Sequence, residues 1–210
     1  MTGNSEGFWL ARLALESFRP SQFPWLKKSR ALCYSPAMHN FFSLLLLFPF
    51  LLTGAQHMPK PDVPEKLAVP AAERLVLQVH ATGSQVYVCQ AGADQKLAWT
   101  LKGPEAELFD AANKSIGKHY AGPTWKHNDG SEVVGKVAAR QDAPDSHDIP
   151  GLLLTAASHA GTGVLANVTS IQRIHTKGGQ PPASGCDDSH RGTETKSAYS
   201  ADYYFYAPAH

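Results

Sequence analysis

Apolar and polar side chains alternate along several short stretches of this chain. In residues 73–81, Leu75, Leu77 and Val79 occupy one side of an extended backbone, and mostly polar residues occupy the other. Successive side chains of a β-strand point to opposite faces, so this period of two predicts a strand with one face toward a core. The same pattern predicts eight or nine short strands, at residues 73–81, 85–90, 97–101, 106–109, 124–127, 132–139, 152–157, 164–176 and 199–206.

Turn-forming residues separate these stretches. Glycine or proline interrupts the pattern at 82–84 and 102–104, and the Asn-Asp-Gly sequence at 128–130 predicts a hairpin turn, because Asp-Gly tolerates positive φ. The run 152–157 is apolar throughout, and its length suits either a buried strand or a turn of helix. No long stretch shows the 3.6-residue period of an amphipathic helix. We therefore predict an all-β fold, an antiparallel sandwich or barrel of about eight short strands.

The N-terminal part has a different character. Residues 41–52 are apolar and uncharged, but this run is shorter than the about 20 residues that a membrane-spanning helix needs. It is typical of the hydrophobic core of a signal peptide, which we place at 38–55 with Met38 as the start and 1–37 as an overextended N terminus. The alternative is a buried or amphipathic N-terminal helix. The signal peptide predicts a secreted or periplasmic protein with no membrane span after its removal.

The positions of the prolines and cysteines indicate where the mature domain begins and how it is cross-linked. Residues 56–70 contain four prolines and predict an extended lead-in, so the β domain is expected over 71–210. The chain has three cysteines, and Cys33 would be removed with the signal peptide. The remaining pair, Cys89 and Cys186, is expected to form a disulfide, because two cysteines in an exported domain most often pair. A reactive free thiol is the alternative.

Composition limits the classes of function. Hydrophobic residues make up 43% of the 210 residues, which provides a core and argues against disorder. The net charge of +1 gives no basic surface, so no nucleic-acid partner is expected. The expected partner is therefore an unknown extracellular or envelope ligand.

Two groups of residues are candidates for metal or anion binding. His119, His127 and Glu132 lie around the hairpin predicted at 128–130 and could bind zinc or copper; the structural alternative is a solvated turn. Arg173 and His175 alternate with apolar residues, so both should lie on one face of a strand. There the guanidinium could bind a carboxylate or phosphate. The structural alternative is a sheet-face residue with an acidic neighbour.

Aromatic residues are the other candidates. Trp125 and Tyr203 could stack against a carbohydrate or could pack in the core, as aromatic residues of strands usually do. Ser158 and His159 are present, but no G-x-S-x-G motif accompanies them. We therefore predict no catalytic residues and no cofactor.

Two segments carry a resemblance to a known family. HYAGPTW at 119–125 and IQRIHTKGG at 171–179 resemble DUF3455, a family of exported bacterial and fungal proteins, and the likeness covers about 63–206. The resemblance implies an exported, β-rich domain, but the family has no established activity from which site residues could be assigned. A weaker likeness around 87–89 connects the chain to small exported inhibitors of c-type lysozyme. We expect a non-enzymatic binding module for a polysaccharide or protein. The alternatives are a metal-binding protein or metalloenzyme that uses the His-rich hairpin, and a lysozyme-inhibitor-like protein.

Overall fold

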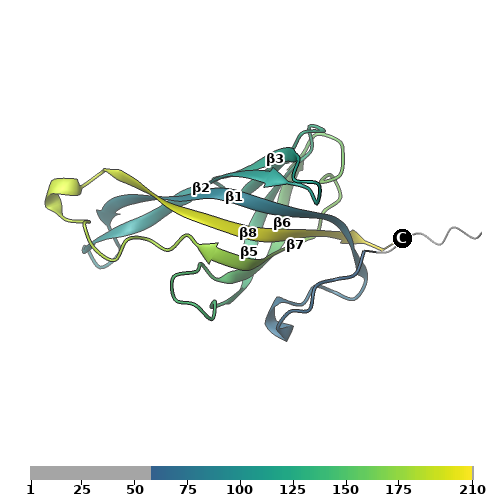
Figure 1. The fold of residues 1–210 in the computed structure, drawn as a ribbon, viewed down its shortest axis with the longest axis horizontal. Coiled ribbons are helices and arrows are strands. Elements are labelled where there is room, and N and C mark those ends of the chain that lie inside the picture. The colour runs from purple at the N-terminus through teal and green to yellow at the C-terminus, as the bar shows by residue number, and fades with distance from the viewer. Residues whose placement is uncertain (1–57, 210) are drawn as a thin grey trace, which may run out of the picture. The chain divides into compact units, whose positions relative to one another are not determined.

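The computed structural model describes residues 58–209, so the predicted signal peptide at 38–55 and the segment 1–37 lie outside the described residues. Eight antiparallel strands pair in chain order and close into a barrel (Figure 1). They are β1 (Glu73–Ala91), β2 (Leu97–Phe109), β3 (Ser115–Tyr120), β4 (Thr124–His127), β5 (Glu132–Gln141), β6 (Gly151–Ala160), β7 (Ser170–Gly178) and β8 (Glu194–Pro208). The all-β antiparallel prediction is confirmed, and of its two forms the protein adopts the barrel.

Short 3-10 turns are the only helical elements in the described part. They are η1 (Glu65–Leu67) and η2 (Asp188–His190). Within residues 58–209, no helix has the length and the apolar character needed to cross a membrane.

Three strands are longer than predicted. β1, β2 and β8 have 19, 13 and 15 residues, so the turns predicted at 82–84 and 102–104 are wrong. Gly83 instead lies in mid-strand, where a Cβ atom would stand 2.2 Å from the Glu105 carbonyl oxygen. Its missing side chain therefore lets β1 and β2 approach each other. Gly103 and Pro104 stay in β2 because the register shifts between Val86 and Tyr87 opposite them, which indicates a β-bulge.

Local turn chemistry is confirmed at the hairpin between β4 and β5. Gly130 adopts a φ of 93°, a conformation that favours glycine, at the predicted turn. The run 152–157 lies in β6 and is a strand, which resolves the helix alternative. The first half of the strand predicted at 164–176 is wrong, because β7 begins only at Ser170. The residues before it form turns that bury Leu165 and Val168 completely against the barrel core.

Aromatic and aliphatic side chains fill the barrel interior. Trp125 packs edge-on against Tyr203 and Phe205, with ring centroids 5.3 and 5.9 Å apart. The rest of this cluster comprises Val79, Ala81, Leu108, Val133, Ile149, Leu154, Leu165, Val168, Ile171, Tyr199 and Ala201. Residues from nearly all strands converge here, so the interior is a packed core over much of its length.

The proline-rich lead-in covers part of the outer face. Leu67 of η1 is 2% exposed and packs with Leu75, Ile174, Tyr204 and Tyr206 on the outside of the barrel. Its carbonyl oxygen accepts a hydrogen bond of 2.6 Å from the Gln172 side chain. The lead-in therefore belongs to the folded domain. The domain start predicted from the prolines, near residue 71, is too late in the chain.

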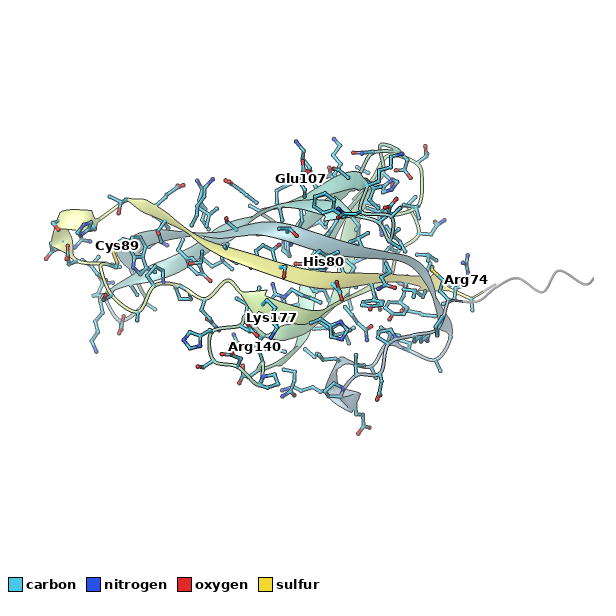
Figure 2. All side chains as sticks on the ribbon, in the orientation of Figure 1. Arg74, His80, Cys89, Glu107, Arg140 and Lys177 are labelled. Carbon is cyan, nitrogen blue, oxygen red and sulfur yellow. A yellow bond between two sulfur atoms is a disulfide. The ribbon has the colours of Figure 1, made fainter. Side chains whose placement is uncertain are left out.

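The predicted disulfide between Cys89 and Cys186 is confirmed. It lies at the end of β1, which Figure 2 shows far from Arg74 at the other end of the strand. The disulfide ties the segment before β8 to β1, and two further contacts support it. The Trp99 indole N–H donates to the Ser184 carbonyl at 2.9 Å, and the Cys89 amide donates to the Thr193 carbonyl at 3.0 Å.

Candidate functional site

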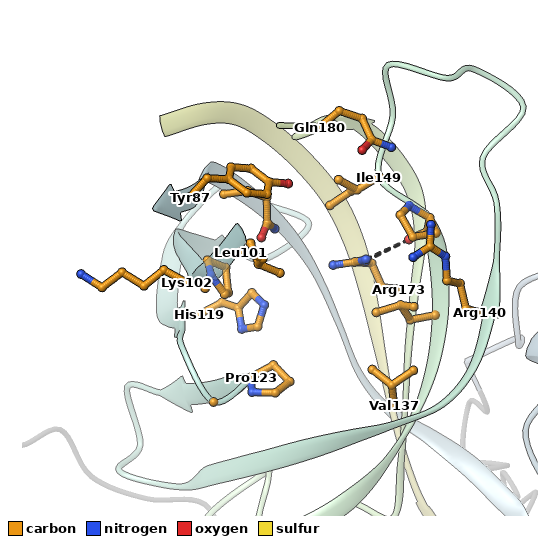
Figure 3. Close-up of a pocket in the computed structure, with 16 residues that line it drawn as sticks. Tyr87, Leu101, Lys102, His119, Pro123, Val137, Arg140, Ile149, Arg173 and Gln180 are labelled. Atoms are coloured by element: carbon orange, nitrogen blue, oxygen red, sulfur yellow. Dashed lines mark hydrogen bonds between the residues drawn. The ribbon is translucent and has the colours of Figure 1, made fainter. Parts of the chain in front are cut away.

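A cavity of about 510 Å³ opens at one end of the barrel interior, within the size range of small-molecule sites. Figure 3 shows side chains from opposite walls of the barrel facing each other across it. Its apolar lining consists of Leu101, Pro104, Pro123, Val137, Ile149, Pro150 and Leu152. Two of these side chains, Leu101 and Val137, are 53% and 51% exposed because no side chain from the opposite wall covers them. The cavity therefore presents an accessible apolar surface.

All charged side chains in the cavity lining are basic. They are Lys102, Arg140 and Arg173. At the rim, Lys102 pairs with Glu194 at 2.6 Å and Arg140 pairs with Asp142 at 3.1 Å. Among the described residues, Arg173 forms no salt bridge.

The Arg173 side chain is held in place by a backbone carbonyl. Its Nε and Nη2 atoms donate to the Pro150 oxygen at 3.1 and 3.0 Å, and the guanidinium extends into the cavity (Figure 3). A guanidinium carries five N–H donors, so donors remain for a ligand beyond those that face Pro150 and the adjacent Tyr203 hydroxyl. Arg173 is thus a positioned cation whose charge no carboxylate neutralises.

His119 lies in the wall of the cavity, stacked on Trp125 with ring centroids 4.4 Å apart. Its Nδ1 lies 2.8 Å from the Thr124 carbonyl oxygen, and because a carbonyl can only accept, Nδ1 carries the proton. Burial lowers the pKa of His119 to about 3, against the opposing effect of the Thr124 hydrogen bond. The imidazole is therefore neutral at ordinary pH, and its Nε2 can only accept a hydrogen bond.

Several buried polar atoms near the cavity lack partners. The Gln85 side chain lines the cavity, is 2% exposed, and has a side-chain nitrogen with no hydrogen bond within the described residues. The hydroxyls of Tyr199 and Tyr203 are buried and also make no hydrogen bond of ordinary geometry there. Burial raises the pKa of Tyr203, and the positive charge of Arg173 opposes this rise. Buried polar groups without partners are rare and need an explanation.

The rim of the cavity is fixed by hydrogen bonds. The Asp148 carboxylate accepts from the Gly178 amide at 2.6 Å and from the Lys177 amine at 3.1 Å. The Gln180 side chain donates to the Asp148 carbonyl at 2.8 Å, and the Tyr87 hydroxyl donates to the Gly179 carbonyl at 2.6 Å. These bonds join the loop before β6 to the segment after β7, so the mouth of the cavity is formed in advance of any ligand.

A family model described as a protein of unknown function, DUF3455, matches residues 70–207. The chain belongs to the DUF3455 family. No curated protein and no solved structure matches it. The matched DUF3455 region contains every residue that lines the cavity, from Gln85 to Gln180, so the site is part of the family domain.

The structure separates the four residues predicted to bind a ligand. In this DUF3455 barrel, Trp125 and Tyr203 are each 1% exposed and lie in the interior, so they offer no surface for stacking. Arg173 lies in the cavity wall. His175 does not share its face, because the strand is irregular between Ile174 and Lys177 and His175 adopts a φ of 51°.

The sequence predicted an acidic neighbour for Arg173 and His175, and within the described residues only His175 has one. The Asp202 carboxylate bonds to Nδ1 of His175 and to Nδ1 of His80, each at 2.8 Å, on the outside of the barrel.

The three predicted metal ligands point to different partners. His119 is bonded to a backbone carbonyl in the interior, His127 lies 3.1 Å from Asp129, and Glu132 accepts a 2.7 Å hydrogen bond from Tyr120. Within residues 58–209, no group of three or more His, Cys, Asp or Glu side chains is arranged to hold a metal ion.

Sequence reasoning missed most of the cavity lining. Gln85, Tyr87, Leu101 and Val137 were assigned to strands or turns without any role. Alternation gives no signal for Gln85 and Tyr87, because these two residues and Val86 between them are all buried.

Proposed function

We propose that this DUF3455 protein is an exported, non-enzymatic binding module that holds a small molecule in the cavity at the open end of its barrel. The observation that carries the proposal is the cavity itself, an apolar chamber of about 510 Å³ with a few positioned polar groups. The polysaccharide or protein ligand expected from the sequence would require an extended outer surface. Because Trp125 and Tyr203 lie inside the barrel, a small ligand is the better match.

The chemistry of the lining supports binding over catalysis. Among the described residues of the cavity wall there is no serine, cysteine, aspartate or glutamate. His119, with a pKa of about 3, is a poor general base near neutral pH, since effective bases have a pKa near the working pH. The hydrogen bond that Lys102 donates to the Glu194 carboxylate raises the pKa of this amine, which keeps it protonated and not nucleophilic.

Export is supported by two features. Residues 38–55 have the pattern of a signal peptide. The disulfide between Cys89 and Cys186 is of the kind that forms and persists in oxidising compartments.

A neutral fluorescent probe tests the proposal. N-phenyl-1-naphthylamine is dark in water and bright in apolar cavities, so it should fluoresce with the wild-type protein. Val137→Trp, which fills the cavity from a half-exposed position, should weaken this binding at least about tenfold, equivalent to about 1.4 kcal/mol. Lys136→Trp is the matched control, because Lys136 is the exposed neighbour on the outer face of the same strand and should leave binding unchanged.

Circular dichroism would establish that both variants are folded. Equal probe binding by wild type and Val137→Trp, with both folded, would refute the cavity as the binding site.

A further inference from the structure

We infer that the ligand of this cavity is an organic carboxylate with an apolar body, whose carboxylate is bound by Arg173. The inference rests on the proposed function and names the chemical class that the site would take. It depends on the charge balance of the lining, the donors that remain free, and the shape of the apolar wall.

The charge balance favours an anion. A charged group in a protein interior is normally paired, because its removal from water is costly. Arg173 is half-buried, has no salt bridge within residues 58–209, and lines a cavity without an acidic side chain. Its hydrogen bonds to the Pro150 carbonyl fix its direction but leave its full charge uncompensated. An anionic ligand would supply the missing partner.

A carboxylate fits better than a phosphate. The other two basic residues of the lining, Lys102 and Arg140, are each paired with an acidic residue at the rim, so one unpaired positive charge remains. A single guanidinium matches the single charge of a carboxylate and can bind both of its oxygens with parallel N–H donors. A phosphate dianion carries more charge and more acceptors than this one group can satisfy.

The neighbouring polar atoms define where the carboxylate lies. The unpartnered side-chain nitrogen of Gln85 is a donor in the cavity wall and can contribute a further hydrogen bond. His119 presents only an acceptor at Nε2, because its proton is held on Nδ1 by Thr124. That lone pair repels a carboxylate, so the anionic end belongs at the Arg173 guanidinium, and the rest of the ligand lies against the apolar wall.

The apolar wall of the cavity determines the chemistry of the rest of the ligand. Leu101 and Val137 are exposed within the cavity, and a ligand that covers them gains hydrophobic free energy. Each buried methylene group should strengthen binding about fourfold, so octanoate should bind much more tightly than butanoate.

Isothermal titration calorimetry with matched eight-carbon probes tests the inference. The chain is produced from its complete sequence, purified with its disulfide formed, and titrated with octanoate, 1-octanol, octylamine and octyl phosphate. Octanoate should bind at least about tenfold more tightly than octanol, since hydrogen bonds to a charged group carry that much selectivity. Octylamine should bind more weakly than octanol.

Arg173→Gln should remove this preference while octanol still binds within about threefold of wild type, which shows that the cavity is intact. Arg191→Gln is the matched control, because Arg191 is exposed, is paired with Asp188 and does not line the cavity, and it should keep the preference for octanoate.

Equal binding of octanoate and octanol by wild type, or a preference that survives Arg173→Gln, would overturn the inference and leave the proposed cavity in place. Tighter binding of octyl phosphate than of octanoate would overturn the choice of a carboxylate. Failure of all four probes, together with failure of N-phenyl-1-naphthylamine, would instead overturn the proposed function itself.

Discussion

Replacing His119 with asparagine tests how a buried neutral imidazole limits the stability of the barrel in acid. The asparagine amide can donate to the Thr124 carbonyl as Nδ1 does, but it does not take up a proton in the same pH range. The substitution also removes the stacking of the ring on Trp125, so the variant should be less stable than wild type at pH 7.5. The informative quantity is therefore the pH dependence of stability in each protein.

The magnitude follows from the two pKa values of the imidazole. Burial lowers the pKa of His119 from its ordinary value of 6.5 to about 3 in the folded protein. Between these pH values the unfolded chain binds a proton that the folded protein does not, so the free energy of unfolding falls as the pH falls. This contribution is fully present above pH 6.5 and decreases by about 1.4 kcal/mol per pH unit below it. At pH 4.5 the expected loss from His119 is about 3 kcal/mol.

Urea denaturation of both proteins at pH 7.5 and pH 4.5 measures this effect. Other groups also destabilise the barrel in acid, but they are common to both proteins and cancel in the comparison. The wild type should lose about 3 kcal/mol more than His119→Asn between the two pH values. His147→Asn is the control, because the His147 side chain is 90% exposed, and it should lose as much as wild type. Identical losses in wild type and His119→Asn would refute the reasoning.

Two further predictions concern stability. Replacing Cys89 and Cys186 together with serine should lower the free energy of unfolding by about 4–5 kcal/mol, because the disulfide closes a loop of 97 residues. Urea denaturation of the double variant and the oxidised wild type measures this, and a change below 1 kcal/mol would contradict it. Leu67→Ala should cost about 2–3 kcal/mol, since the lead-in buries this side chain against the barrel. Its control is Lys66→Ala at the exposed neighbouring position, and equal midpoints for both variants would show that the lead-in adds no stability.

Local chemistry explains the parts of the fold that the sequence predicts well. A turn at 128–130 depends on the backbone preferences of Asp and Gly, which act within a few residues. Alternation of apolar residues depends only on the geometry of a single strand. The strands flanking this hairpin and the all-β class are therefore predicted closely, and the pairing of Cys89 with Cys186 was predicted from the expected removal of Cys33 with the signal peptide.

Long-range pairing explains the turns that were predicted wrongly. A glycine in a turn and a glycine that lets two strands approach have the same local sequence signal. Gly83 has the second role, and the contact that decides it comes from Glu105 in the next strand. A bulge likewise keeps Pro104 within β2, and its position depends on the register with β1. Neither contact can be inferred from the neighbouring residues alone.

Two of the candidate residues named from the sequence lie in the cavity wall: Arg173, predicted to bind an anion, and His119, predicted as a metal ligand. The cavity exists because the inward-facing side chains Leu101 and Val137 are not covered from the opposite wall, and this depends on how eight strands meet in space. His175 was placed with Arg173 by simple alternation, but the irregularity after Ile174 turns it to the outer face beside Asp202. Strict alternation fails wherever a bulge adds a residue.

The position of the disulfide also affects how the barrel closes during folding. β1 and β8 pair from Glu73 with Pro208 to Val88 with Glu194, so the closing seam joins residues that lie far apart along the chain. Bringing such residues together costs loop-closure entropy, and topologies rich in such contacts fold slowly. Cys89 adjoins Val88, and Cys186 precedes Glu194 by only a few residues. Once the disulfide has formed, the first paired residues of β1 and β8 are joined through a short covalent connection. The pairing of these two strands, which otherwise closes the longest loop of the barrel, then becomes a local step.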